Sequence, residues 1–202
     1  MKKAKSFAVY AGIAALWTAV VVMMFTGWLG EMPQAETEKT AQKVEQPKPT
    51  VQVEEVITYD VPLDEDLKQY IISECESKGV DPAVLFGMIE QESGFNADAI
   101  GDGGDSLGLM QIQYKWHGER MERLGCNDLL DPYQNVKLGI DILHELIGYY
   151  CGDLEQAVIA YNCGVSGAHN NYFSQGLYES EYSKNVMANA ESIKGVAYEY
   201  SR

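Results

Sequence analysis

MIEQESGFNADAIGDGGDSLGLMQIQ, residues 88–113, joins an apolar helix to a loop rich in Gly and Asp. The apolar residues 83–89 run into the carboxylate of Glu92, after which a Ser-Gly pair interrupts the helical pattern. Desolvation at such a position disfavours the charged form of a carboxyl, which can then stay protonated near neutral pH and act as a general acid. The alternative is a surface Glu that ends a core helix beside a Gly.

The sequence around this stretch is helical in pattern. Four segments open with an Asp in the position of a helix N-cap, and in two of them Pro follows: Asp64, Asp81, Asp131 and Asp153. A last helix is predicted over 182–200, while the Gly, Asn and Ser content of 165–176 predicts a loop. No strand pair is predicted. The expected fold class is therefore mainly α, with one domain at 61–202.

The first 30 residues have the pattern of a membrane anchor. Residues 6–30 carry no charge, and this run of 25 exceeds the roughly 20 residues that a spanning helix needs. Three Lys precede the run and three Glu follow it, which predicts a cytoplasmic N-terminus and an extracytoplasmic remainder. A cleaved signal peptide would have a shorter apolar region and a cleavage site of small residues. We therefore expect residues 1–30 to be a single-pass anchor in the cell membrane, with the rest on the cell-wall side.

Residues 31–60 have the composition of a flexible, disordered linker. They contain three Pro and many Glu, Gln, Lys and Thr, and no apolar helical face. Four branched apolar residues near the end could form a short extended stretch against the domain: Val51, Val53, Val56 and Ile57.

Charge and cysteine content narrow the function classes. The net charge of −15 argues against nucleic-acid binding and against docking on an anionic membrane surface. Four cysteines in an exported chain permit two disulfides, and free thiols are the alternative: Cys75, Cys126, Cys151 and Cys163. Their spacing to one another and to the three His fits no zinc motif, so no metal or other cofactor is expected.

Cleavage of a glycosidic bond is one chemistry that Glu92 could support. An acid must protonate the leaving oxygen, and most such enzymes use a second carboxylate. Asp98, Asp102 and Asp105 are candidates for this partner, and the sequence does not choose among them.

Three strings, ESGFN, GLMQI and AYNCG, occur in this order. Together they resemble the catalytic domain of soluble lytic transglycosylases, over about residues 63–201. The resemblance implies a goose-lysozyme-like fold and cleavage of peptidoglycan between N-acetylmuramic acid and N-acetylglucosamine. It also implies that Glu92 is the single catalytic carboxyl, acting first as acid and then as base. The C6 hydroxyl then closes on C1 to leave a 1,6-anhydro product, with the substrate's acetamido group in place of a second carboxylate.

The same resemblance assigns the substrate-binding residues. These are Gln111 and Gln113 in the cleft, Tyr161 and Asn162 of the AYN segment, and Tyr182. Gly101 stands where many members have a sugar-contacting Ser. Packing is the preferred role for Trp116.

Two alternative functions stay open. One is a hydrolase of the same fold, in which Asp102 or Asp105 orients a water. The other is an inactive wall-binding module of a secretion or conjugation assembly, because residues 101–121 also resemble a subgroup from bacterial mobile elements and phage-like proteins.

Overall fold

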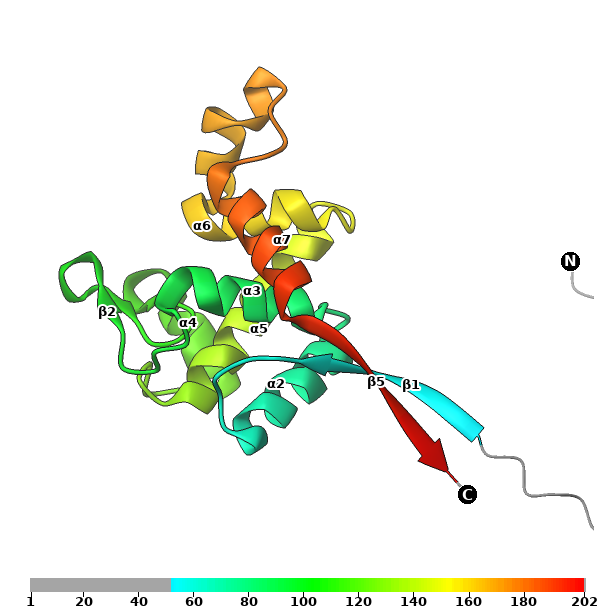
Figure 1. Cartoon of the computed structure of the whole chain (residues 1–202). Helices are drawn as coiled ribbons and strands as arrows, with labels where there is room; N and C mark the ends of the chain where they lie inside the picture. The colour runs from blue at the N-terminus through cyan, green and yellow to red at the C-terminus, as the bar shows by residue number, and fades with distance from the viewer. Residues whose placement is uncertain (1–51, 202) are drawn as a thin grey trace, which may run out of the picture. The chain divides into compact units, whose positions relative to one another are not determined.

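The computed structural model describes residues 52–201, so the predicted anchor at 1–30 and most of the predicted linker lie outside the described residues. Among residues 52–201 no helix is both long and apolar enough to cross a membrane. The described chain is mainly helical, as the sequence predicts (Figure 1). The helices are α2 (Glu65–Lys78), α3 (Pro82–Ser93), α4 (Tyr114–Leu124), α5 (Pro132–Tyr149), α6 (Leu154–Asn171) and α7 (Glu181–Ile193), with short 3-10 turns η1 (Asp102–Gly104) and η2 (Phe173–Gln175).

The predicted helix starts are confirmed, because they depend on local chemistry. Each of the four Asp caps accepts a hydrogen bond from a backbone N–H in the first turn of its helix, at 2.9–3.1 Å. The two Pro residues occupy the first helical position of α3 and α5. These caps satisfy N–H groups that have no partner inside the helix.

Two small sheets correct the prediction that no strands pair. Strand β1 (Gln52–Tyr59) pairs antiparallel with β5 (Lys194–Ser201), and the last helix ends at Ile193 instead of Tyr200. The short strands β2 (Ile100–Gly101), β3 (Ser106–Leu107) and β4 (Ile112–Gln113) form the second sheet. Strand β1 lies within the predicted linker. In Figure 1, β1 and β5 extend from the helices as a two-stranded ribbon.

Helix α6 corrects the predicted loop at 165–176. The helix continues to Asn171 across a kink at Gly164, whose φ of 73° and ψ of 160° are not helical. Beyond the kink, Ala168 is fully buried against Ile159 and Ala160. Burial of this small apolar face outweighs the low helix propensity of the Gly and Asn residues.

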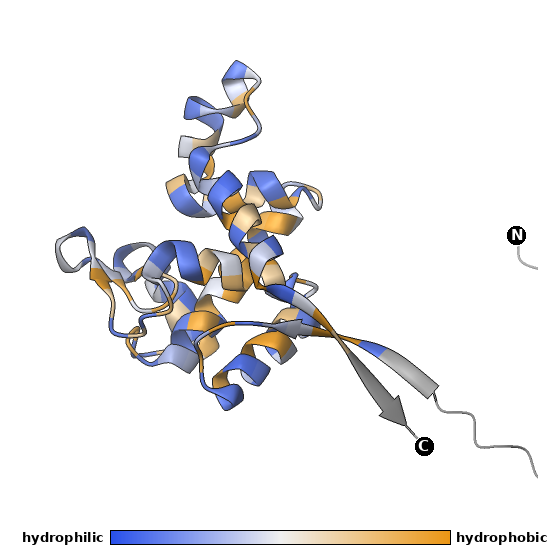
Figure 2. Ribbon diagram, in the orientation of Figure 1, coloured by the Kyte–Doolittle hydropathy of each residue, from blue (hydrophilic) through white to orange (hydrophobic). Residues whose placement is uncertain are grey.

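Helices α3 and α7 pack with their backbones close together, and this contact positions the site. A Cβ on Gly87 of α3 would lie 2.5 Å from the Val186 carbonyl oxygen and 2.9 Å from the Ala190 nitrogen. Glycine is therefore required there for α7 to approach. Figure 2 shows the hydrophobic faces of the helices turned toward one another and hydrophilic residues on the outer faces. The largest fully buried side chains come mainly from α3, α5 and the GLM segment: Phe86, Leu85, Met88, Ile89, Leu109, Met110, Leu138, Ile140 and Leu143.

A buried ion cluster joins α2, α4 and α5. The Asp141 carboxylate accepts from Lys78 at 2.9 Å, from Arg120 at 2.5 Å and from Arg123 at 2.8 Å. Burial alone would raise the pKa of Asp141, but these three hydrogen bonds outweigh burial and hold the pKa well below its usual range. The cluster therefore keeps a charged carboxylate inside the fold.

Candidate active site

Glu92 is the second-last residue of α3, and Tyr182 from the first turn of α7 reaches it. The Tyr182 hydroxyl donates to the Glu92 carboxylate at 2.5 Å. A capping box fixes the start of α7: Ser180 accepts from the Ser183 backbone N–H at 3.0 Å, and the Ser183 hydroxyl accepts from the Ser180 N–H at 2.9 Å. The cap places Tyr182 over the end of α3, 90 residues away in sequence.

The Glu92 carboxyl is held in the state that a general acid needs. Burial raises its pKa to about 7; the Tyr182 hydrogen bond acts in the opposite direction, and the charge of Asp102 raises it further. A pKa near working pH lets one group donate and then accept a proton. This environment differs from that of an exposed Glu at a helix end, the alternative that the sequence left open.

Tyr161 joins α6 to the GLMQI segment beside Glu92. Its hydroxyl donates to the Met110 carbonyl oxygen at 3.0 Å. Burial and the neighbouring Glu92 charge raise its pKa well above 10, so the hydroxyl stays protonated. The next residue, Asn162, is exposed. The structure therefore brings Glu92, Tyr161 and Tyr182 together and leaves Asn162 at the surface.

Gln111 shapes the loop with its own amide. Its backbone is left-handed, with a φ of 47°. Its Nε2 donates to the Gly108 carbonyl at 2.9 Å and to the Ala99 carbonyl at 3.2 Å. A Cβ on Gly101 would clash with the Gln111 Oε1. The Gln111 amide therefore fills the space that a side chain at position 101 would occupy. The resemblance leads one to expect Ser at that position.

Gln113 is the centre of a polar network. Its Nε2 donates to Asp102 at 2.9 Å and to Ser106 at 2.8 Å, and its Oε1 accepts from the Trp116 indole N–H at 3.0 Å. Ser106 also donates to Asp102, at 2.6 Å. Trp116 is 74% exposed, so the expectation of a packing role for it is wrong.

Asn135 holds the loop that carries the GLMQI segment, and sequence reasoning missed it. It is fully buried on α5, where its Oδ1 accepts from the Met110 N–H at 2.8 Å. Its Nδ2 donates to the carbonyls of Leu107 and Leu129, both at 2.8 Å. A lone amide side chain among the apolar positions of 135–143 was the available signal, since buried polar groups require partners. Asn135 therefore holds the backbone of Met110, the residue whose carbonyl accepts from Tyr161.

Of the three acids considered as partners of Glu92, only Asp102 adds to the rise in its pKa. Asp105 is paired with Lys115 at 2.6 Å, and Asp98 is exposed. Within residues 52–201, no three His, Cys, Asp or Glu side chains are grouped to hold a metal. All four cysteines are free thiols, and Cys75 and Cys126 are buried.

Two proteins that are similar to this chain in sequence are lysozymes of type g. Lysozyme g from Gallus gallus is 28% identical over 138 residues, which cover 61% of this chain and 61% of that protein. Lysozyme g from Casuarius casuarius is 30% identical over 131 residues, which cover 59% and 68% of the two chains. The chain therefore matches about three fifths to two thirds of the length of these relatives.

Solved lytic transglycosylases share the fold. An inactive mutant of the lytic transglycosylase Slt from Pseudomonas aeruginosa superposes with a TM-score of 0.53 at 23% identity, covering 64% of this chain and 24% of that one. The 70 kDa soluble lytic transglycosylase from Escherichia coli gives 0.54 at 19% identity with the same coverage. The family model of the Transglycosylase SLT domain matches residues 69–185, more than half of the 202 residues. The chain belongs to the transglycosylase SLT domain family, with a mainly helical, lysozyme-g-like fold.

Proposed function

We propose that this protein is a lytic transglycosylase that cleaves the β-1,4 bond between N-acetylmuramic acid and N-acetylglucosamine in peptidoglycan. The observation that carries the proposal is Glu92, which has a pKa of about 7, accepts a hydrogen bond from Tyr182 and lies beside Tyr161. Membership of the family and the likeness to Slt and lysozyme g support a glycan of the cell wall as the substrate.

In the proposed reaction Glu92 serves twice. Protonated Glu92 donates its proton to the oxygen of the glycosidic bond, which breaks and leaves positive charge at C1 of the muramic acid. The acetamido group of the same sugar stabilises that centre. The Glu92 carboxylate then takes the proton of the C6 hydroxyl, whose oxygen closes on C1 to give the 1,6-anhydro product. Tyr182 favours the carboxylate form that this second step requires, because it donates a hydrogen bond to it.

Hydrolysis is the second candidate, and one observation favours it. Asp102 is close enough to Glu92 for its charge to raise the Glu92 pKa, so it could orient a water on the substrate. However, the Asp102 carboxylate already accepts from both Ser106 and Gln113. These bonds would have to be shared with a water, which makes the single-carboxyl reaction our first choice.

We further propose that residues 1–30 anchor the protein in the cell membrane, with the catalytic domain on the cell-wall side. This rests on the charge-free run and its flanking Lys and Glu residues. A glycan-cleaving domain in that place could open the wall for a secretion or conjugation assembly, which is the partner we propose.

Mass spectrometry of peptidoglycan digested with the full-length protein tests the reaction. We expect anhydromuropeptides from the parent and none from Glu92→Gln, which keeps the size of the side chain but removes its proton donor. Products heavier by one water would replace transglycosylation with hydrolysis. Glycan binding by a folded parent without any product would replace both with a wall-binding module.

A further inference from the structure

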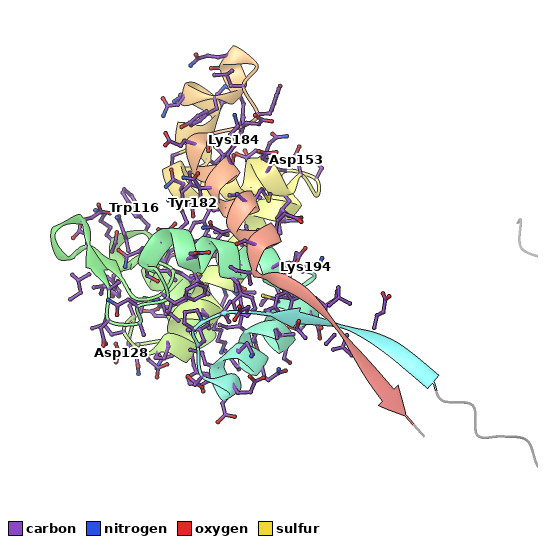
Figure 3. The ribbon with its side chains drawn as sticks, viewed as in Figure 1. Trp116, Asp128, Asp153, Tyr182, Lys184 and Lys194 are labelled. Atoms are coloured by element: carbon purple, nitrogen blue, oxygen red, sulfur yellow. The ribbon has the colours of Figure 1, made fainter. Side chains whose placement is uncertain are left out.

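Trp116 is a large aromatic side chain held at the surface beside the candidate active site. It lies in the first turn of α4, and the residue is 74% exposed. Figure 3 shows Trp116 projecting from the part of the domain that holds α4 and β2, on the side where Tyr182 lies. An exposed indole leaves a flat apolar face in water, against which the apolar face of a ligand can pack.

The indole is fixed on both its edge and one face. Its N–H donates to the Gln113 Oε1 at 3.0 Å, and the Lys115 ammonium lies 5.7 Å from the ring centroid. Lys115 is itself paired with Asp105 at 2.6 Å. Because Lys115 covers one face, the other face remains available to a ligand. A ring that is already oriented loses little conformational freedom on binding.

The hydrogen-bonded network that holds Trp116 includes Asp102, whose charge acts on Glu92. Gln113 joins the Trp116 indole to Asp102 and Ser106, and the charge of Asp102 reaches Glu92. Gln113 uses both amide hydrogens and its oxygen within this network. Its geometry therefore suits a residue that positions Trp116, and differs from the direct sugar contact that the family resemblance implies.

We propose that the free face of Trp116 binds the apolar C–H face of an N-acetylhexosamine ring, next to the cleaved bond on the Asp102 side of Glu92. The inference rests on the proposed function, since it assigns a further sugar subsite to the same cleft. Sugar C–H groups carry partial positive charge and meet the negative face of the indole, while the sugar hydroxyls stay in water. Trp116 thus selects a glycan strand that extends past the bond being cleaved.

Kinetics with soluble, peptide-free glycan strands test this role. We expect Trp116→Ala to raise KM about tenfold with kcat changed less than about threefold, as loss of one aromatic contact would do. Trp116→Phe keeps an aromatic face but loses the bond to Gln113, so its KM should lie between those of the parent and Trp116→Ala. The control is Tyr149→Ala, which removes an aromatic side chain of similar exposure, 64%, at the end of α5 and should leave KM unchanged. An unchanged KM in Trp116→Ala would overturn the proposal.

Fluorescence separates this proposal from the reaction itself. The chain has three tryptophans, so the full-length protein with Trp17→Phe and Trp28→Phe retains only Trp116. With Glu92→Gln added to block cleavage, titration with the same glycan strands should shift Trp116 emission to the blue and saturate. Emission that does not change while the strands bind would overturn the proposal that Trp116 binds a sugar ring. If the emission changes saturably but the parent protein cleaves no glycan, Trp116 binds sugar and the proposed lyase function is wrong.

Discussion

Two carboxyl groups of this domain, Glu92 and Asp141, are both partly or fully withdrawn from water, but their pKa values are shifted in opposite directions. Asp141 has a side chain only 8% exposed and meets Lys78, Arg120 and Arg123, which hold its pKa well below the usual range. Glu92 meets the hydroxyl of Tyr182, and burial raises its pKa to about 7. The neighbours that replace water, rather than burial itself, decide whether a carboxyl is a permanent ion or a proton donor.

The two carboxyl groups are therefore suited to different roles, Asp141 to holding the fold together and Glu92 to proton transfer. Asp141 joins three helices, and its three cationic partners favour its charged form. Glu92 has the hydroxyl groups of Tyr182 and Tyr161 as neighbours, and its pKa of about 7 lets it change its charge near neutral pH.

Glu92→Gln should reduce glycan cleavage by a factor of about 10³ or more, since removal of a general acid and base usually has an effect of this size. The fold should remain intact, because Gln can still accept the Tyr182 hydrogen bond. Initial rates of product release, measured beside circular dichroism of both proteins, check this. Residual activity within tenfold of the parent would show that another group is the acid.

Glu92→Gln should also change how the stability of the domain depends on pH. The pKa of Glu92 is about 7 in the folded protein and about 4.5 in the unfolded chain. Its contribution to stability is therefore fully present below pH 4.5 and is lost as pH rises through about 7. Between pH 5 and 8 the parent should therefore lose stability relative to Glu92→Gln. Urea unfolding of both proteins at these two pH values measures the change, and a difference independent of pH would argue against a desolvated Glu92.

Asp141→Asn should destabilise the domain by about 3 kcal/mol, because Lys78 and Arg123 lose their charged partner and Arg120 keeps only Glu145. The pKa of Asp141 is lowered in the fold, so its contribution is present above the unfolded value near 4 and is lost as pH falls through the folded value. Urea unfolding at pH 7 and at pH 3 checks both statements. Stability that matches the parent at pH 7 would mean that the ion cluster contributes nothing net.

Tyr182→Phe should lower kcat about tenfold and move the alkaline limb of the kcat/KM profile to higher pH. The Tyr182 hydrogen bond favours the Glu92 carboxylate, so its loss raises the Glu92 pKa above about 7. Rates across pH 5–9 provide the measurement. A shift of the limb to lower pH would contradict the assigned contact.

Asp102→Asn should produce the smallest effect, a shift of the same limb to lower pH by less than about one unit. The substitution removes a negative charge that raises the Glu92 pKa and keeps an oxygen for Ser106 and Gln113. A loss of activity as large as that of Glu92→Gln would instead indicate that Asp102 activates water, as hydrolysis requires.

Local signals in the sequence predicted much of the fold. The Asp caps were predictable because cap and helix are neighbours in the chain, and the apolar spacing identified the faces of α3 and α5. Strand β5 was not predictable in this way, because its partner β1 lies about 140 residues earlier and the apolar residues before it continue the pattern of α7. The part of α6 that follows the kink at Gly164 was not predictable either, because it depends on the burial of Ala168 against the rest of the fold.

The sequence predicted which residues lie close together better than it predicted their contacts. The resemblance identified Glu92, Tyr161 and Tyr182, which the structure brings together. It could not show that Gln111 and Gln113 direct their amides into the protein, since both bonding partners depend on how the loop folds. Asn135 escaped notice because its partners, Met110 and Leu107, lie on the loop that it organises 25 or more residues away.

The charge state of Glu92 is the most direct test of this account. NMR titration of the side-chain carboxyl carbons, with Glu92→Gln used to assign the resonance, would follow Glu92 from pH 4 to pH 9. We predict a midpoint of about 7. A midpoint near 4.5, the ordinary value for Glu, would contradict the claim that this carboxyl is held protonated to act as the acid.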